Sequence, residues 1–221
     1  MPLSIPTSCQ QRGRAKNCQA EIIIYYNDRT YVVKFSRSPV SHYYRSLHII
    51  PNSVLSYTTE YSCSDNDNCA IDFASKKVLD LSNRTYNIAS VTDHLSNLLL
   101  EHRPPSDPEL RCYNNEECVK GVCQTLYNIR TSTMRGKGCL KNTTAQVLVL
   151  DGSFDPSLSI VCNRTRCNSP ETYNKVKEIL FRHNLTDING RLNGGQKSCV
   201  SAFLLIVTLH LFVFLCNGFF F

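Results

Sequence analysis

Cysteine is the residue type in this chain whose number and spacing offer the most chemistry. Twelve cysteines occur in 221 residues, and two of them, Cys199 and Cys216, lie in an apolar tail. The other ten are Cys9, Cys18, Cys63, Cys69, Cys112, Cys118, Cys123, Cys139, Cys162 and Cys167. An even number fits complete pairing into disulfides. Zinc is the competing interpretation, but no Cys-x-x-Cys pair of the kind zinc sites favour occurs. The cysteines therefore predict disulfides and an oxidising compartment.

Spacing alone favours two particular disulfides. Five residues separate Cys63 from Cys69, and four separate Cys162 from Cys167. A short polar loop of this kind can hold the two Cα atoms within the distance of about 7 Å that a disulfide requires. The pairing of the remaining cysteines stays open from spacing alone.

The other reactive side chains form no recognisable catalytic or metal-binding pattern. The chain lacks Gly-x-Ser-x-Gly, a phosphate loop, His-Glu-x-x-His and a dinucleotide-binding glycine motif. Asp151 and Asp155 have the spacing of an acid–base pair, but the glycine and proline beside them indicate a turn. The histidines before the tail are His42, His48, His94, His102 and His183, and none has a carboxylate or cysteine at ligand spacing. We expect no enzymatic activity, no cofactor and no metal.

The C-terminal tail, residues 193–221, indicates contact with a membrane. Its apolar part, residues 200–215, would give about 24 Å of helix, which is short for a hydrocarbon core of about 30 Å. No Lys or Arg follows it, as one usually does after a transmembrane helix. Small residues, a brief polar spacer and an apolar run are typical of a glycolipid (GPI) attachment signal. We predict lipid attachment at Asn193; a peptide anchor and a misread gene end are the alternatives.

The start of the chain conflicts with secretion. A secretory leader needs an apolar run of about 7–15 residues near the N-terminus. Residues 1–17 contain none. Either a leader lies upstream of Met1, or the protein is tail-anchored and faces the cytosol, which Arg191 and Lys197 before the tail would suit. The cysteine content favours the upstream leader.

Surface signals agree with an extracellular protein. Glycosylation sequons occur at Asn83, Asn142, Asn163 and Asn184. The net charge of +6 is spread along the chain, without the basic stripe and aromatic platforms of a nucleic-acid-binding protein. We therefore expect no nucleic-acid partner.

The elements that must position these residues are short. Residues 20–26 and 30–35 predict a β-hairpin, and residues 54–61 predict a strand that leads into Cys63. Residues 37–51 are polar and indicate a loop. The apolar periodicity predicts helices over 71–81 and from Ser90 to about residue 99, the second with a Ser90–Asp93 capping box.

The second half follows a similar order. Residues 125–130, 145–150 and 158–162 predict strands, and residues 134–138 predict a turn. Ser169 as N-cap and Pro170 in the first turn predict a helix that continues to about residue 180. Because each half places a cysteine loop between a strand and a helix, a diverged duplication is one explanation.

The predicted fold is therefore α+β, with two small disulfide-rich modules. Each module has antiparallel strands followed by an amphipathic helix. The expected boundaries are an N-terminal segment 1–17, a first module 18–103, a proline-rich linker 104–111, a second module 112–192 and the tail 193–221.

Residues 110–168 resemble the three-finger family of urokinase-receptor-like surface domains. The resemblance rests on Leu110-Arg111-Cys112-Tyr113 and on Cys162, four residues, then Cys167-Asn168. It implies a Cys162–Cys167 disulfide, with Cys112–Cys123 and Cys118–Cys139 as further pairs, and a GPI anchor. The chain departs from the family pattern at Val161, where an adjacent cysteine is usual, and in the helix that follows.

These observations together predict a GPI-anchored, disulfide-bonded glycoprotein on the extracellular face of the plasma membrane. Its expected role is binding or adhesion to an extracellular protein ligand, with the membrane outer leaflet as its other partner. The alternatives are a small membrane-tethered secreted hydrolase and a tail-anchored cytosolic adaptor.

Overall fold

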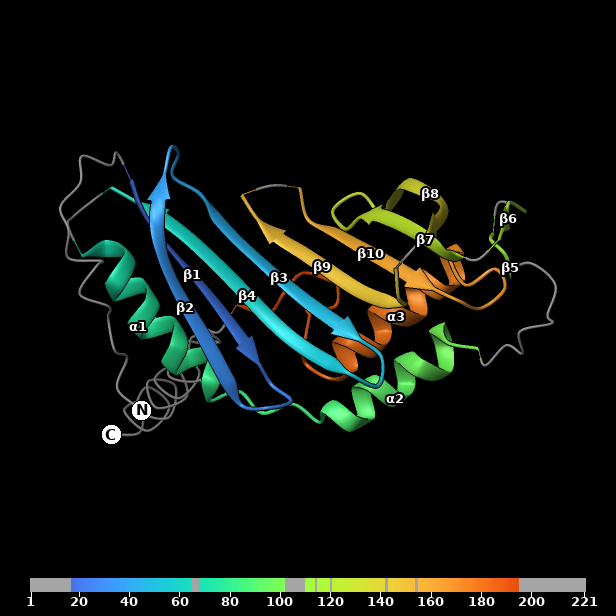
Figure 1. Cartoon of the computed structure of the whole chain (residues 1–221), viewed down its shortest axis with the longest axis horizontal. Coiled ribbons are helices and arrows are strands. Elements are labelled where there is room, and N and C mark those ends of the chain that lie inside the picture. Colours follow the sequence, from blue (N-terminus) through green and yellow to red (C-terminus); the bar gives the residue numbers. More distant parts are fainter. Residues whose placement is uncertain are drawn as a thin grey trace, which may run out of the picture.

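The computed structural model describes residues 17–64, 68–101, 110–113, 115–119, 121–141, 143–153 and 155–194. Its elements are β1 (Asn17–Tyr25), β2 (Thr30–Ser38), β3 (Tyr43–Ile50), β4 (Val54–Cys63), α1 (Cys69–Ser82), α2 (Ile88–Leu99), β5 (Leu110–Arg111), β6 (Glu117–Cys118), β7 (Gly121–Asn128), β8 (Thr133–Lys141), β9 (Gln146–Gly152), β10 (Ser157–Cys162) and α3 (Pro170–Arg182) (Figure 1). Cys9, Asn142, most of the predicted linker and the apolar tail lie outside the described residues.

Eight strands form one antiparallel sheet in the order β2-β1-β4-β3-β9-β10-β7-β8, and β5 and β6 form a separate pair (Figure 1). In the first half, β1 pairs with β2 and β4, and β3 pairs with β4. In the second half, β7 pairs with β8 and β10, and β9 pairs with β10. Each half thus repeats one pairing order, and the halves meet where β3 pairs with β9.

The predicted fold class, two linked modules of strands followed by a helix, is wrong, because one sheet and one core run through both halves. Buried Leu47 and Ile49 of β3 stand opposite Val149 and Val147 of β9, so side chains from the two halves share a single apolar layer. A separate core for each half would have required β3 to be absent or at an edge.

The strand that joins the halves lies within residues 37–51, which the sequence analysis predicted to be a loop. Strand β3 was missed because Arg45 stands in phase with Leu47 and Ile49 on the buried face. A charged residue on that face hides the apolar alternation that marks a strand. The turn predicted at residues 134–138 is likewise wrong, because these residues lie inside β8.

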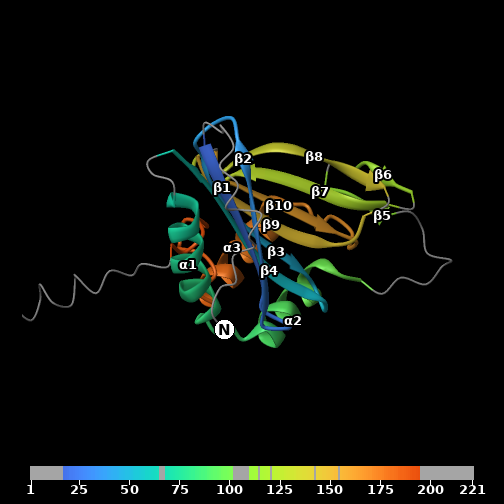
Figure 2. The ribbon, with the colours of Figure 1, turned by 60° about the vertical axis from the view of Figure 1, so that its left-hand side comes forward.

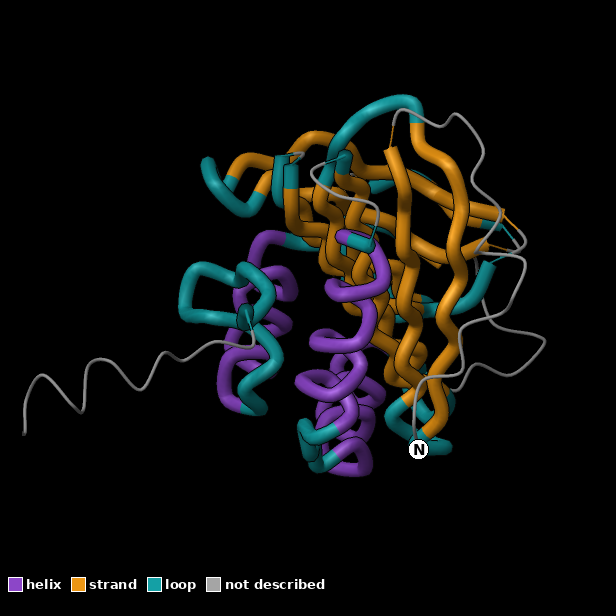
Figure 3. The backbone as a smooth tube through the Cα atoms, turned by 90° about the vertical axis from the view of Figure 1, so that its left-hand side faces the viewer, coloured by secondary structure: helices purple, strands orange, loops and turns teal. Residues whose placement is uncertain are grey.

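The three described helices lie on one side of the sheet, so that strands and helices form two layers (Figures 2 and 3). Each helix buries an apolar stripe, with Val78 and Leu81 of α1, Leu95 of α2, and Val176 and Leu180 of α3 among the buried residues. Full burial of one such side chain contributes about 1.5–3 kcal/mol. These stripes therefore hold the helical layer on the sheet.

The sequence analysis predicted the start of α3 correctly and placed the start of α2 too late. The hydroxyl of Ser169 caps α3 and Pro170 occupies its first turn, which confirms the prediction for that helix. Helix α2 begins at Ile88 and is capped by Asn87, which accepts from the N–H of Ser90. The predicted cap at Ser90 is therefore two residues inside the helix.

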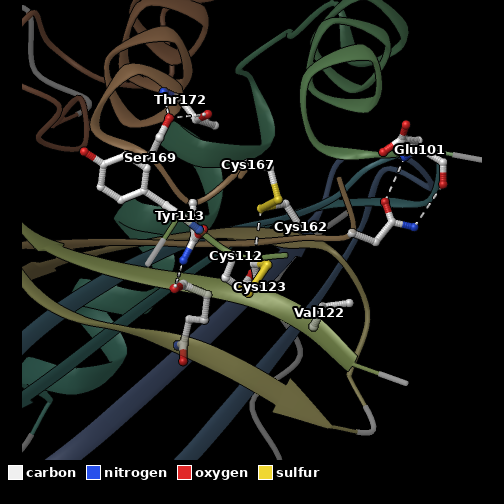
Figure 4. The surroundings of a disulfide bond; sticks show 12 residues. Glu101, Cys112, Tyr113, Val122, Cys123, Cys162, Cys167, Ser169 and Thr172 are labelled. Carbon is white, nitrogen blue, oxygen red and sulfur yellow. Dashed lines mark hydrogen bonds between the residues drawn. A yellow bond between two sulfur atoms is a disulfide. The ribbon is translucent and has the colours of Figure 1, made fainter. Parts of the chain in front are cut away.

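The described residues contain four disulfides, and these bonds join pairs that the sequence analysis named. The bonds are Cys63–Cys69, Cys112–Cys123, Cys118–Cys139 and Cys162–Cys167. The first joins the end of β4 to α1, the second and third attach the β5–β6 pair to β7 and β8, and the fourth joins β10 to the loop before α3. Figure 4 shows two of them, Cys112–Cys123 and Cys162–Cys167, side by side below α3. Each bond contributes about 2–4 kcal/mol by restricting the unfolded chain.

Candidate functional site

A pocket of about 400 Å³ lies where the end of α1 meets the segment that follows α3. Its lining residues are Asp80, Arg84, Thr85, Tyr86, Asn184, Asn193 and Gly194. The first four belong to the first half of the chain and the last three to the second half. The pocket therefore joins both halves, at the end of the described chain.

The segment after α3 folds back because its backbone is tied locally. Asn184 takes a left-handed conformation with φ 58°, which ends the helical direction. Leu185 and Leu192, each 3 % exposed, anchor the two ends of the following loop in the core. Between them, the carboxylate of Asp187 accepts two backbone N–H groups at 2.9 Å each. This loop brings the chain back to α1.

Asn193, the predicted lipid attachment residue, is fastened to the fold. Its side-chain amide donates to the carbonyl oxygens of Asn184 at 2.8 Å and Thr186 at 3.2 Å. Its backbone N–H donates to the carbonyl of Leu185 at 3.3 Å, and its own carbonyl accepts from Nη1 of Arg84 at 3.3 Å. Asn193 is therefore held at a fixed place between the loop after α3 and Arg84.

Arg84 is the central cation of the pocket. Its Nη2 donates to Asp80 at 3.1 Å, and its guanidinium lies 5.6 Å from the centre of the Tyr57 ring. Burial lowers the pKa of Arg84, but its contacts with Tyr86 and Asp80 outweigh burial and leave the pKa raised. Arg84 is therefore a permanent positive charge. Asp80 also contacts Lys77 at 3.6 Å, so this carboxylate is shared by two cations.

A second ion cluster lies beside the first, on the sheet. The carboxylate of Asp151 on β9 is fully buried and accepts from Arg45 of β3 at 2.5 Å and from Arg191 at 2.9 Å. Nε of Arg45 is buried and has no hydrogen-bond partner among the described residues. A Cβ placed on Gly194 would lie 3.4 Å from Nη1 of Arg45. The Arg45 cluster therefore reaches the end of the described chain.

Positive charge exceeds negative charge around these two clusters. The groups are the cations Lys77, Arg84, Arg45 and Arg191 and the carboxylates Asp80, Asp151 and Asp187, the last of which acts on Arg191. With four cations and three carboxylates, one positive charge is unbalanced within this set. Chemically, the arrangement suits a singly charged anion, since arginine donates to phosphate and carboxylate oxygens in a fixed fork.

The sequence analysis missed the arginines of this site and assigned Asp151 to a turn. One sequence signal could have found part of it. Arg45 and Asp151 each extend an apolar alternation, Arg45 before Leu47 and Asp151 after Val149. A charge on a buried strand face requires an opposite partner, so the two strands could have been paired. No comparable signal marks Arg84 or Arg191.

The structure does not bring Asp151 and Asp155 together as an acid–base pair. Asp155 is exposed and contacts Arg135 at 2.6 Å, and the hydrogen bond and charge of that arginine lower the pKa of its carboxyl. Asp151 is held by other arginines in the core.

A serine, a histidine and a glutamate do meet at the other end of the first half. Oγ of Ser62 lies 3.0 Å from Nδ1 of His42, and Nε2 of His42 lies 2.5 Å from Glu60. The Ser62 hydroxyl, however, donates to the carbonyl of Val40 at 2.6 Å and accepts from the backbone N–H of His42 at 2.8 Å. This buried hydroxyl is occupied by the main chain, so the group ties β4 to the segment before β3.

Two histidines that the sequence places far apart also meet. Nδ1 of His94 on α2 lies 3.2 Å from Nε2 of His183, at the end of α3. Burial lowers the pKa of His183, and the nearby His94 and Arg182 lower it further. Among the described residues, no group of three or more His, Cys, Asp or Glu side chains is arranged to hold a metal ion.

The predicted glycosylation sites differ in their surroundings. Asn83, at the end of α1, and Asn184 are exposed. Asn163 is half-buried, and its amide is used on both sides by the backbone of Glu101, with bonds of 2.9 and 3.3 Å (Figure 4). Asn142 lies outside the described residues.

Of the predicted disulfide residues Cys9 and Cys18, the structure describes Cys18 alone. Cys18 is exposed and unpaired among the residues that the structure describes, and Cys9 lies outside them.

The predicted membrane anchor, residues 193–221, is described only at Asn193 and Gly194. Within the described part of the chain, the helices are too short or too polar to span a bilayer.

Comparison with known proteins assigns no family. No family model matches this chain, and no curated protein matches it.

Proposed function

We propose that this protein is a disulfide-bonded binding protein, held on the extracellular face of the plasma membrane by a GPI anchor attached at Asn193. The observation that carries the proposal is the pairing of eight described cysteines in four disulfide bonds. Asn193 and Gly194 close the pocket, and they are also the first of the small residues that precede the polar spacer and the apolar run. The sequence pattern for attachment thus begins at two residues that line the pocket.

The disulfides support an oxidising location. Eight cysteines are paired in four bonds, and such a density is typical of secreted and cell-surface domains. A tail-anchored protein facing the cytosol would keep these thiols reduced. The same bonds would suit a domain that must remain folded outside the cell.

The geometry favours binding over catalysis. Among the lining side chains, Arg84 donates to Asp80 at 3.1 Å, and the hydroxyl of Ser62 is occupied by the main chain. The two motifs that resemble three-finger surface domains lie against each other. The N–H of Tyr113 donates to Asn168 at 2.7 Å, and that of Arg166 donates to the carbonyl of Arg111 at 2.8 Å. This contact is consistent with the resemblance to receptor-like binding domains.

The proposal can be tested on cells that express the full gene with an epitope inserted after Asp28, in the exposed turn between β1 and β2. A phosphatidylinositol-specific phospholipase should release the epitope from intact cells. Alkylation of the denatured, unreduced protein should find the eight bonded cysteines unavailable.

Two results would overturn the proposal. Retention of the epitope after phospholipase treatment would indicate a peptide anchor. Alkylation of all the cysteines before the tail, with an epitope reached by antibody only after permeabilisation, would indicate a cytosolic adaptor. The matched control is a variant with Asn193, Gly194 and Gly195 replaced by bulky residues. This variant should lose both the display of the epitope on the cell surface and its release by the phospholipase.

A further inference from the structure

We propose that the pocket beside Asn193 binds the phosphate of the protein's own lipid anchor, with Arg84 and Arg45 donating to the phosphodiester. This inference rests on the proposed lipid attachment at Asn193. The ligand of the pocket would be a phosphodiester that is covalently joined to the chain. The domain would then be docked on its anchor rather than tethered loosely above the membrane.

The position of the attachment point places the phosphate near both arginines. In a GPI anchor, the carbonyl carbon of the last residue is joined to ethanolamine, and the ethanolamine oxygen is esterified to phosphate. Ordinary bond lengths put the phosphorus about 5 Å from the new amide nitrogen. The carbonyl oxygen of Asn193 lies 3.3 Å from Nη1 of Arg84. The position of Gly194, which the ethanolamine would replace, is 3.4 Å from Nη1 of Arg45 when measured from a Cβ placed there.

The attachment point is also fixed in direction. Three hydrogen bonds from Asn193 to the carbonyl oxygens of Asn184, Thr186 and Leu185 hold the residue against the loop after α3. A group attached to its carbonyl carbon therefore starts inside the pocket. Preorganisation of this kind reduces the entropy that would be lost when the phosphate is held.

The charge of the site matches this ligand. Within the two ion clusters, four cations face three carboxylates, and Nη1 of Arg45 lies 3.4 Å from a Cβ placed on Gly194, which lines the pocket. A phosphodiester carries one negative charge, and its oxygens accept the forked donors of arginine. Asp80 competes for Arg84, but it keeps Lys77 as a partner at 3.6 Å if Arg84 turns to the phosphate.

The pocket is large enough to hold a larger group than the phosphate alone. A volume of about 400 Å³ lies within the range of small-molecule sites, and Thr85, Tyr86 and Asn184 add polar groups to its wall. The first sugar after the phosphate would meet these groups. The same chemistry could come from the headgroup of a membrane phospholipid, and the test below separates the two sources.

The test uses protein released from cells by the phospholipase, which keeps the ethanolamine phosphodiester. Its ³¹P resonance reports motion of that phosphate. If the phosphate is held, the diester line should be several-fold broader in the folded protein than after unfolding in urea, because a bound group tumbles with the whole domain. Arg84→Gln should narrow the folded-state line towards the unfolded value. Arg135→Gln removes an exposed arginine that does not line the pocket and should leave the line broad.

The outcomes separate this inference from the proposed function. If the released protein carries the diester but its line is equally narrow folded and unfolded, the docking inference is wrong and the anchor stands. If no ethanolamine is found on the protein, the proposed function itself fails. A narrow diester line combined with a shift of added glycerophosphoethanolamine would assign the pocket to a membrane headgroup and overturn the inference. The wild-type comparison needs no variant, so the test holds even if Arg84→Gln does not fold.

Discussion

The buried carboxylate of Asp151 gives the sharpest prediction from the fold. Asp151 on β9 is the partner of Arg45 on β3, across the pair of strands that joins the two halves. The substitution Asp151→Asn keeps the shape of the side chain and removes its charge. It leaves Arg45, whose side chain is 13 % exposed, as a mostly buried cation without an opposite charge.

The magnitude follows from the exposure of the two arginines. Removing one partner of a buried pair costs about 3–5 kcal/mol. Arg191 is 46 % exposed and can return to water, so we expect the lower end, about 3 kcal/mol. Against a total stability of about 5–15 kcal/mol this is a large loss. For a chain of this size it corresponds to a fall in Tm of about 6–12 °C.

Thermal and urea unfolding of the purified protein, followed by circular dichroism with disulfides intact, would measure this loss. The matched control is Asp155→Asn, which breaks an exposed pair with Arg135 and should leave Tm unchanged within error. The double variant Arg45→Met with Asp151→Leu should recover much of the stability, since it leaves no buried charge unpaired. Equal Tm values for wild type and Asp151→Asn would refute the reasoning.

Three further predictions follow from the structure. Ile49→Ala should lower the free energy of unfolding by about 2–5 kcal/mol while the protein still unfolds in one transition, because this fully buried residue lies at the junction of both halves. The control is Ile188→Ala, at a residue that is 71 % exposed. Two separate unfolding transitions would contradict a shared core. The free energy of unfolding should fall as the pH drops through about 6.5, because the depressed pKa of His183 means that the unfolded state binds a proton at this histidine first. The dependence of stability on pH should be weaker in His183→Asn. A stability that rises in acid would contradict this prediction. Asn163→Ala should destabilise the protein even when the protein is made without glycans, because the amide of Asn163 makes two hydrogen bonds to the backbone of Glu101. A stability equal to that of the wild type would show that these two bonds contribute nothing measurable.

Several local signals in the sequence predicted local structure correctly. The hairpin at residues 27–29, the Ser169 cap and the short disulfide loops all depend on residues close together in the chain. In each case the physical cause, turn chemistry, helix capping or loop closure, acts over a few residues. Such causes can be recognised without knowing the fold.

The joining of the halves could not be recognised in that way. Arg45 is tolerated on a buried face only because Asp151, 106 positions later, supplies the opposite charge. Without that partner, the polar sequence of β3 indicated a loop, and the missing strand divided one sheet into two predicted modules. The pocket has the same origin, since Arg84 and Asn193 meet across 109 positions. Contacts of this range are set by tertiary packing, which a pattern in one segment does not contain.

The chemical nature of the chain's end in the natural protein tests lipid attachment most directly. Cleavage after Glu178 would release a C-terminal peptide that starts at Ile179, and its mass would identify that end. We predict a peptide that stops at Asn193 and carries ethanolamine phosphate on its terminal carbonyl. A peptide that continues through Lys197 into the apolar residues would contradict lipid attachment, and with it both the proposed function and the docked anchor.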